Sequence, residues 1–254
     1  MRQLAVDALT VKVFDDVASL AGAAAQDAAR ALRGAIEARG EANVMLATGN
    51  SQLAFLAELV QFTDIAWDRV RAFHMDEYVN LSPAHPASFR RYMRERVASR
   101  LPLKEFHYLE GDTADADAEA RRYEALLRAH PLDLCCCGIG ENGHLAFNDP
   151  PVADFADPRD VKVVPLELAS RRQQVGEGHF ATLDDVPTHA ITVTIPALLR
   201  AGSVLVIVPE ARKAQPVHDA LYGAISTACP SSILRRYPNA TLYLDAESSA
   251  RLPR

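Results

Sequence analysis

The chain alternates short apolar runs, rich in β-branched residues, with stretches whose apolar positions recur every three or four residues. The runs are typical of buried strands, and the stretches between them are typical of helices with one buried face. Such alternation indicates a parallel sheet covered by helices on both faces. Nine strands are predicted: Val11–Phe14, Asn43–Ala47, Val70–Met75, Phe106–Leu109, Leu132–Cys137, Val161–Pro165, Ala190–Ile195, Ser203–Val208 and Ala240–Leu244.

The clearest helix is expected between Asp15-Asp16 and Gly40. Aspartate is a good N-cap, and glycine suits the residue that ends a helix. Between them one face carries apolar side chains at helical spacing: Val17, Leu20, Ala24, Ala28, Ala31 and Ala35. Four further helices are predicted over Gln52–Val60, Ala87–Val97, Ala114–Arg128 and Arg212–Leu221.

The 254 residues, 49% of them hydrophobic, are enough for a sizeable core. No internal repeat and no Ser/Gly linker divides them, so we expect one domain over residues 1–254. The alternation of strands and helices is interrupted over residues 149–187, which are rich in Pro, Asp, Gly and Arg. A long excursion of this kind is either a lid over a site or a mobile surface loop.

The composition argues against several classes of partner. With a net charge of −6 and no long Lys/Arg cluster, the chain is not expected to bind nucleic acid. Nothing approaches the ~18 apolar residues that span a bilayer, and the first ten residues do not resemble a signal peptide. The four cysteines have no metal-site spacing and fit small buried side chains in a reducing compartment: Cys135, Cys136, Cys137 and Cys229. We therefore predict a soluble cytoplasmic protein without a metal or cofactor; a homo-oligomer is compatible with the sequence, which leaves the oligomeric state open.

Four polar loops directly follow four of the predicted strands: Thr48–Ser51, Asp76–Tyr78, Gly138–His144 and Pro209–Lys213. In open α/β sheets, ligands bind outside the carboxyl ends of the strands. If these strands are parallel neighbours, all four loops lie at one edge of the sheet and form one site.

The first of these loops, Thr48-Gly49-Asn50-Ser51, offers small residues with free backbone N–H groups at the start of a helix. Such an arrangement binds phosphate. It is neither a Walker A loop nor a dinucleotide fingerprint, and an ordinary turn has the same appearance. Lys213, and an arginine of the Arg171-Arg172 pair, are candidates for the positive charge that a phosphate needs.

Asp76 follows an apolar strand and lies close in sequence to Phe73 and Tyr78, so its carboxylate is a candidate general base in a partly dry environment. Glu77 is expected to point the other way, because side chains alternate along a strand. A helix cap or a surface acid is the ordinary alternative for Asp76. His74 and His85 lie nearby, but no other feature indicates a metal site.

His144 follows three closely spaced glycines and has Asn142 and Asp149 within reach in the sequence. A carboxylate beside an imidazole sets its tautomer and stabilises its protonated form. The histidine is therefore a candidate acid/base, although a solvated histidine in a Gly-rich turn is the ordinary alternative.

With these loops assembled, the chain resembles the glucosamine-6-phosphate deaminase (isomerase) family, which is related to 6-phosphogluconolactonases. The pieces F-H-M-D-E-Y and G-H-L-A-F-N-D-P are specific in combination. The likeness extends across nearly the whole chain through Leu46–Ser51, Phe73–Tyr78, Gly138–Pro150 and Val204–Lys213, supported by His85–Phe89 and Thr192–Leu199. It implies a three-layer α/β/α sandwich with a mostly parallel, Rossmann-like sheet.

The resemblance also implies a reaction. The ring of an amino-sugar 6-phosphate, of the glucosamine or galactosamine series, opens, a proton moves from C2 to C1, and the C2 amine leaves as ammonia. Asp76 matches the base for this proton transfer, and His144 matches the histidine of ring opening, assisted by Asn142 and Asp149. Further matches concern phosphate binding: Thr48, Gly49, Asn50 and Ser51 as the loop, Lys213 as its lysine, and Arg172, in preference to Arg171, as the arginine from the excursion.

Several positions depart from the family pattern. Well-known members carry an aspartate where this chain has Asn142, and an amide cannot take a proton. Asp149 replaces a glutamate, which shortens the reach by one methylene, and the phosphate loop is T-G-N-S where T-G-G-T is usual. Serines used for allosteric activation in hexameric members are not matched around Val152-Ala153, so allosteric activation is not expected.

Two other functions remain as alternatives. A 6-phosphogluconolactonase hydrolyses an ester and needs no carbon-acid base, and its glycine–histidine loop usually continues differently from Ala146–Asp149. A non-catalytic sugar-phosphate sensor would explain the changes at Asn142 and Asp149, but Asp76 and His144 are both present and no DNA-binding segment is attached.

Overall fold

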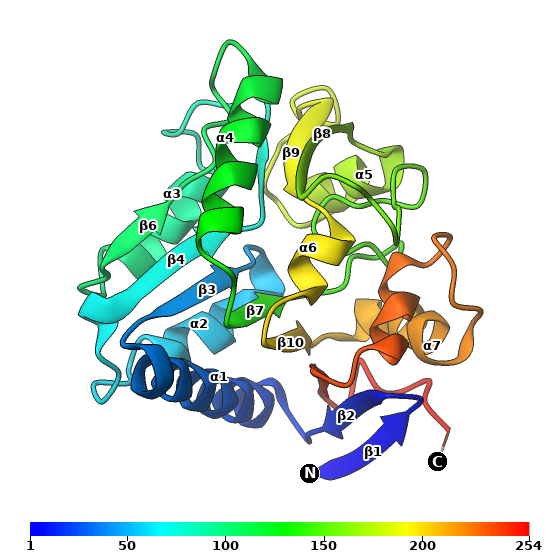
Figure 1. Cartoon of the computed structure of the whole chain (residues 1–254). Helices are drawn as coiled ribbons and strands as arrows, with labels where there is room; N and C mark the ends of the chain where they lie inside the picture. Colours follow the sequence, from blue (N-terminus) through cyan, green and yellow to red (C-terminus); the bar gives the residue numbers. More distant parts are fainter. Residues whose placement is uncertain (254) are drawn as a thin grey trace.

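The computed structural model describes residues 1–253 and is built around an eight-stranded sheet (Figure 1). Its order is β1-β2-β11-β10-β7-β3-β4-β6. Only β1 runs antiparallel to its neighbour, and all other pairs are parallel, which confirms the prediction of a mostly parallel sheet. The strands are β1 (Arg2–Val6), β2 (Leu9–Val13), β3 (Ala42–Leu46), β4 (Val70–His74), β6 (Glu105–His107), β7 (Leu134–Cys137), β10 (Ser203–Val208) and β11 (Ala240–Leu244).

Helices cover both faces of this sheet, as predicted. One face packs against α1 (Val17–Arg39), α2 (Leu53–Leu59) and α3 (Phe89–Met93), which continues as a wider turn over Arg94–Ala98. The other face packs against α4 (Ala116–Ala129), α6 (Ile195–Leu199) and α7 (Ala214–Tyr222). Strand β7 shows why the sheet needs both layers: Leu134 and Cys136 belong to the first core, and Cys135 and Cys137 belong to the second.

Helix α1 begins and ends where the sequence predicts. The side chain of Asp16 accepts a hydrogen bond from the Ser19 N–H at 2.7 Å. Gly40 closes the helix with a φ of 80°, and its N–H donates to the Ile36 carbonyl at 2.7 Å. Its many alanines let the helix lie close against the strands, because they add little side-chain bulk.

Two predicted strands do not join the main sheet. The runs Val161–Pro165 and Ala190–Ile195 form β8 (Val161–Pro165) and β9 (His189–Val193), which pair antiparallel with each other. The short strand β5 (Asp76–Tyr78) pairs with β9 and completes a separate sheet in the order β5-β9-β8. An apolar run predicts a strand but not its partner, which explains why the sequence did not separate these strands from the main sheet.

The excursion over residues 149–187 is folded in part. It contains β8 and helix α5 (Leu168–Gly176), which lies beside the small sheet in Figure 1. None of the helices in residues 1–253 is long and apolar enough to cross a bilayer.

The order of the main sheet reverses direction between β3 and β7. From β3 the chain builds outward through β4 and β6, whereas β7 lies on the opposite side of β3 and leads to β10 and β11. At such a reversal, the connections that follow two neighbouring strands lead to opposite faces of the sheet, which leaves a crevice at the carboxyl ends of those strands. The fold therefore places its crevice beside the loops that follow β3 and β7.

We expect Gly111→Ala to destabilise the connection between the two sheets. A Cβ at Gly111 would lie 2.0 Å from the carbonyl oxygen of Tyr78 in β5, so the strand has to shift. Overpacking of this kind costs about 1–3 kcal/mol and lowers the Tm of a protein of this size by roughly 2 to 10 °C. Thermal unfolding measures the change.

The matched control is Gly34→Ala in α1, where a Cβ meets nothing within 4 Å. Alanine favours a helix by up to about 1 kcal/mol over glycine, so its Tm should rise by a few degrees. A Gly111→Ala protein as stable as the wild type would contradict the close approach seen here.

Candidate active site

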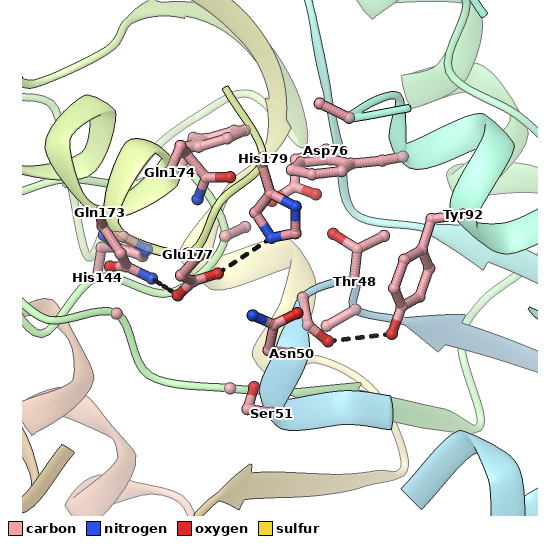
Figure 2. Close-up of a pocket in the computed structure, with 18 of the residues that line it drawn as sticks. Thr48, Asn50, Ser51, Asp76, Tyr92, His144, Gln173, Gln174, Glu177 and His179 are labelled. Atoms are coloured by element: carbon pink, nitrogen blue, oxygen red, sulfur yellow. Dashed lines mark hydrogen bonds and ion pairs between the residues drawn. The ribbon is translucent and has the colours of Figure 1, made fainter. Parts of the chain in front are cut away.

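One pocket lies at the carboxyl edge of the main sheet, beside the crevice between β3 and β7. Loops after β3, β4, β7 and β10 contribute to it, together with the end of α5 (Figure 2). The structure thus brings together at this pocket most of the residues singled out in the sequence: Thr48, Gly49, Asn50, Ser51, Asp76, His144 and Lys213. Asn142 and Asp149 do not line it but contact His144 from behind.

The loop after β3 lines the pocket. Gly49 has a φ of 101°, a conformation that favours glycine, and the chain then turns into a short helical segment that leads into α2. The hydroxyl of Tyr92 in α3 donates to the Gly49 carbonyl at 3.0 Å, and Gln52 Nε2 donates to Ser51 Oγ at 3.0 Å. Neighbouring elements therefore hold the loop in one conformation.

Lys213 lies at the start of the last helix, where β10 leads toward α7. Its side chain lines the pocket, although the residue is only 3% exposed. Burial lowers the pKa of Lys213, and the charge of Glu177 acts in the opposite direction. Within residues 1–253 no acceptor lies within hydrogen-bond distance of its Nζ, so the ammonium group is available to an anion in the pocket.

Asp76 lies where the chain passes from the main sheet into the small one. Its backbone pairs with Thr192 of β9, and its side chain faces the pocket. The residue is 7% exposed, and its Oδ1 atom is buried without a hydrogen-bond partner in the part of the chain that the structure describes. Burial, together with the negative charge of Glu77, raises the pKa of Asp76 to about 8.

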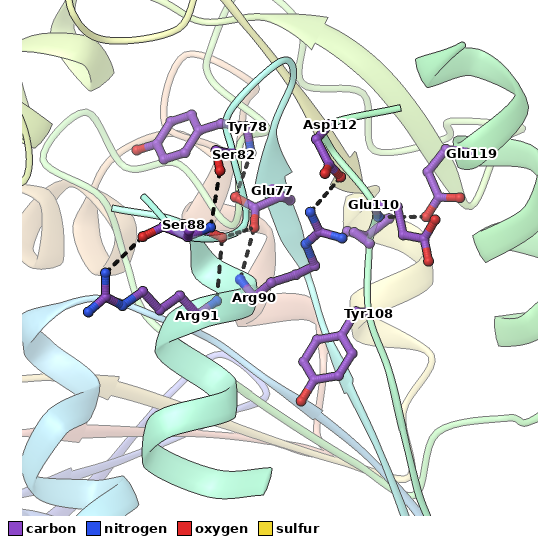
Figure 3. Close-up of polar contacts among 12 residues, drawn as sticks. Glu77, Tyr78, Ser82, Ser88, Arg90, Arg91, Tyr108, Glu110, Asp112 and Glu119 are labelled. Carbon is purple, nitrogen blue, oxygen red and sulfur yellow. Dashed lines mark hydrogen bonds and ion pairs between the residues drawn. The ribbon is translucent and has the colours of Figure 1, made fainter. Parts of the chain in front are cut away.

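Glu77 does not line the pocket, in agreement with the expected alternation of side chains, and its own polar contacts are shown in Figure 3. Its carboxylate accepts hydrogen bonds at 2.8 to 3.2 Å from four donors: the N–H groups of Tyr78, Phe89 and Arg90, and the hydroxyl of Ser88. Two of these N–H groups belong to the first turn of α3, so Glu77 ties that helix to β5. Two adjacent carboxylates thus differ, because one is fully hydrogen-bonded and the other is not.

His144 lines the pocket, and polar side chains outside the pocket contact its Nδ1 atom. Its Nδ1 lies 2.7 Å from Asn142 Oδ1, 2.8 Å from Asp149 Oδ1 and 3.1 Å from Ser170 Oγ. The ring lies against Gly140, where a Cβ would be only 2.2 Å from the imidazole, so only glycine fits. Nε2 has no protein partner in residues 1–253 and is the ring nitrogen open to a ligand.

Asp149 stays ionised behind the histidine. Burial raises the pKa of Asp149, but hydrogen bonds from His144, Ser170 and Asn142 outweigh it and lower the value to about 2. The hydroxyl of Ser170 donates to Asp149 Oδ1 at 2.5 Å. A buried carboxylate at this position favours a proton on Nδ1 and stabilises the imidazolium form.

Asn142 bridges two carboxylates. Its Nδ2 donates to Asp149 Oδ1 at 3.0 Å and to Glu167 Oε2 at 2.6 Å. Sequence reasoning missed both Glu167 and Ser170, which lie around the start of α5 in the excursion. No motif or spacing marked them, since their approach to His144 depends on how the excursion folds back.

Residues of α5 and the turn after it complete the pocket, namely Gln173, Gln174, Glu177 and His179. Arg172 is exposed and does not line the pocket, so the structure does not bring it to the other predicted residues. Arg171 donates to the carbonyls of Leu183 and Val186 and holds the excursion itself together. Successive residues on a helix are turned by about 100°, so the face that presents Gln173 and Glu177 directs Arg172 elsewhere.

The arginine that does line the pocket is Arg212, next to Lys213. The described residues contain no group of three or more His, Cys, Asp or Glu side chains placed to hold a metal ion. The site therefore offers a buried carboxyl, a supported imidazole and two cations around one space, a set suited to acid/base chemistry on an anionic ligand.

Comparisons with known proteins agree with this geometry. A family model described as glucosamine-6-phosphate isomerases/6-phosphogluconolactonase matches residues 15–243. Over 203 residues the chain is 37% identical to a glucosamine-6-phosphate deaminase of Bacillus thuringiensis (strain Al Hakam), a match that covers 80% of this chain and 75% of that relative.

Solved structures show the same fold. A monomeric glucosamine-6-phosphate deaminase superposes with a TM-score of 0.86 at 28% identity, over 94% of this chain and 98% of that chain. A 6-phosphogluconolactonase from Shewanella baltica OS155 superposes with a TM-score of 0.74 at 20% identity, over 92% of this chain and 96% of that chain, a likeness of fold alone. Because the family model matches residues 15–243 and a relative is 37% identical over 203 residues, the chain belongs to the glucosamine-6-phosphate isomerase/6-phosphogluconolactonase family.

Proposed function

We propose that this protein is an amino-sugar phosphate deaminase that converts glucosamine 6-phosphate, or its galactosamine epimer, and water into the ketose 6-phosphate and ammonia. Deaminases among its relatives support this assignment. The observation that carries it is Asp76, a buried carboxyl with one oxygen unpaired among residues 1–253, in a pocket that also contains His144 and Lys213.

Asp76 is the base for the carbon acid. Ionised, it takes the proton from C2 of the open-chain substrate and returns it to C1. A second proton passes from the amine nitrogen to O1, so that the C1 aldehyde becomes an alcohol and the C2 amine becomes an imine. Water then adds to the imine, and ammonia leaves to give the ketose. A carboxylate with its pKa raised toward neutrality is a stronger base than an exposed one, which suits the removal of a weakly acidic proton. Lactone hydrolysis removes no proton from carbon, so it needs no base for a carbon acid.

His144 opens the ring. Its Nε2 exchanges a proton between the ring oxygen and the C1 hydroxyl, while Asp149 holds Nδ1 and stabilises the imidazolium that forms between these transfers. Asn142 contributes orientation rather than a proton, because its amide joins Nδ1, Asp149 and Glu167 in one network. The substitution of Asn for Asp at this position is therefore accompanied by a second carboxylate, Glu167.

The phosphate group binds at the loop Thr48–Ser51. Lys213 supplies the charge, and Arg212 lies beside it in place of the arginine sought at Arg172. In this proposal the excursion over residues 149–187 acts as a lid, since α5 and its following turn complete the pocket. The single domain over residues 1–254 and the cytoplasmic location predicted from the sequence stay predictions.

The test of the function is direct. Incubation with glucosamine 6-phosphate should release ammonia and fructose 6-phosphate in equal amounts, measured by two coupled assays. The galactosamine epimer tests the preference at C4, and 6-phosphogluconolactone serves as the comparison substrate. If both amino sugars are inert at micromolar enzyme while the lactone is hydrolysed, the deaminase assignment is wrong and the lactonase alternative holds.

The substitution Asp76→Asn tests whether Asp76 is the base, because the amide keeps the shape of the side chain but cannot take a proton. Loss of the base should lower kcat by about 100-fold or more and abolish proton exchange at C2, while inorganic phosphate still binds. For the wild type, kcat/KM should rise with pH up to about 8, because only the ionised carboxylate is a base. A pH-independent rate between pH 6 and 9 would remove Asp76 from the mechanism.

The same substitution should stabilise the fold at neutral and alkaline pH. The pKa of Asp76 lies near 8 in the folded protein and near 4 in the unfolded chain, so the folded state binds an extra proton between these values. The carboxyl therefore costs stability increasingly as the pH rises from about 4 to about 8. The Tm difference between Asp76→Asn and the wild type should grow over this range; a difference that shrinks would contradict the burial of an unpaired carboxyl.

Asn142→Asp tests the relay behind His144. A carboxylate at residue 142 would face Glu167 and Asp149 at hydrogen-bond distance, and such like-charge contacts cost several kcal/mol, so kcat/KM should fall by about tenfold or more. The double variant Asn142→Asp/Glu167→Gln removes the charge of Glu167 and should recover the part of the loss that Glu167 causes, while the repulsion from Asp149 remains. Additive losses in the two single variants and the double variant would show that Glu167 does not belong to the network.

A further inference from the structure

The cationic end of the pocket is already crowded with negative charge. Arg212 is paired with three carboxylates: Glu210 Oε2 lies 2.6 Å from its Nε, and Glu177 Oε1 and Glu141 Oε1 lie 2.8 and 3.5 Å from its Nη1. Lys213, the next residue, is buried with no acceptor within hydrogen-bond distance in residues 1–253. One arginine is thus satisfied from within the protein, and the neighbouring lysine is not.

Glu177 differs from the other two carboxylates by its burial and by its origin. Its side chain is 5% exposed, against 37% for Glu210 and 43% for Glu141. It follows directly after α5, so it belongs to the excursion, whereas Glu210 comes from the same loop as Arg212. Its carboxylate also accepts from Gln173 Nε2 at 2.8 Å and lies 3.3 Å from His179 Nε2, as the dashed lines in Figure 2 show.

The loop Thr48–Ser51, Lys213 and Glu177 line the same pocket. A phosphate bound between the loop and Lys213 would therefore share that pocket with the carboxylate of Glu177. Two anions that share one pocket wall repel each other, and a contact between like charges costs several kcal/mol. Arg212 cannot keep its full pairing with Glu177 while it also neutralises a phosphate dianion. The contact seen here and a bound phosphate are therefore in competition.

We propose that Glu177 is a displaceable internal anion of the phosphate site, which pairs with Arg212 in the free protein and gives up that partner to the substrate phosphate. This inference rests on the proposed function, since it needs a phosphate in the pocket. Glu177 is thus a positioning residue that makes phosphate binding weaker than the two cations alone would allow, and it couples that binding to the end of α5.

The release is local, because a second contact holds the excursion nearby. Phe180, three residues after Glu177, is 6% exposed and packs edge-on against Tyr78 with ring centroids 5.5 Å apart. The ring of His85 also stacks on Phe180, with ring centroids 5.4 Å apart. When phosphate takes Arg212, the turn from Glu177 to His179 should therefore move while Phe180 stays seated in this aromatic cluster.

The experiment measures binding of inorganic phosphate by calorimetry at constant ionic strength, for the wild type, Glu177→Gln and Glu210→Gln. Glu177→Gln should bind phosphate about tenfold more tightly, because the competing charge is gone while the side-chain shape is kept. Glu210→Gln removes a charge from the same arginine, but at a partly exposed position outside the excursion. It should improve binding by less than about threefold, since exposed charges are screened.

Hydrogen exchange gives the second measurement. The N–H groups of Glu177, Gly178 and His179 are hydrogen-bonded to carbonyls in α5, and saturating phosphate should speed their exchange in the wild type. In Glu177→Gln, exchange should already be fast without phosphate.

If Glu177 only holds the site together, Glu177→Gln will bind phosphate no more tightly than the wild type, and the inference is overturned. If none of the three proteins binds phosphate, the phosphate site of the proposed function fails, which is a distinct outcome.

Discussion

The reversal of strand order between β3 and β7 decides where this protein can bind a ligand. Parallel strands deliver their following loops to one edge, and the reversal keeps helices from covering that edge at one point. The polar groups that follow the main-sheet strands depend on this arrangement, from the loop after β3 to Lys213 after β10. The apolar residues on both faces of the sheet, such as Cys135 and Cys136 on adjacent positions of β7, keep the strands in the register that aligns those loops.

The small antiparallel sheet adds what the main sheet cannot supply. It begins at Asp76, so the carboxyl is held by strand pairing at the boundary of two sheets rather than on a free loop. Burial there without a partner costs stability, and Glu77, one residue later, has four donors and ties α3 to the same strand. Of these two neighbouring acids, the fold thus satisfies one with hydrogen bonds and leaves an oxygen of the other without a partner among residues 1–253.

The excursion supplies partners to two of the residues that depart from the family pattern, Asn142 and Asp149. Where an amide stands at Asn142, the excursion brings Glu167 to its Nδ2 and Ser170 to Asp149, so the imidazole of His144 remains surrounded by matched donors and acceptors. At the other end of the same segment it brings Glu177 to Arg212. A single stretch of chain thus supports His144 at one end of the pocket and modifies the charge around Arg212 and Lys213 at the other.

The sequence by itself determined the alternation of strands and helices, the caps of α1 at Asp16 and Gly40, and the loops that carry Asp76, His144 and Lys213. These features follow from local spacing and from the rule that parallel strands end at one edge. Only the tertiary structure decided that β8 and β9 form a second sheet, because an apolar run does not encode its partner. It also decided that Arg172 points outward while Arg212, Glu167 and Glu177 reach the site, since helix rotation and the return path of the excursion depend on packing between segments far apart in the chain.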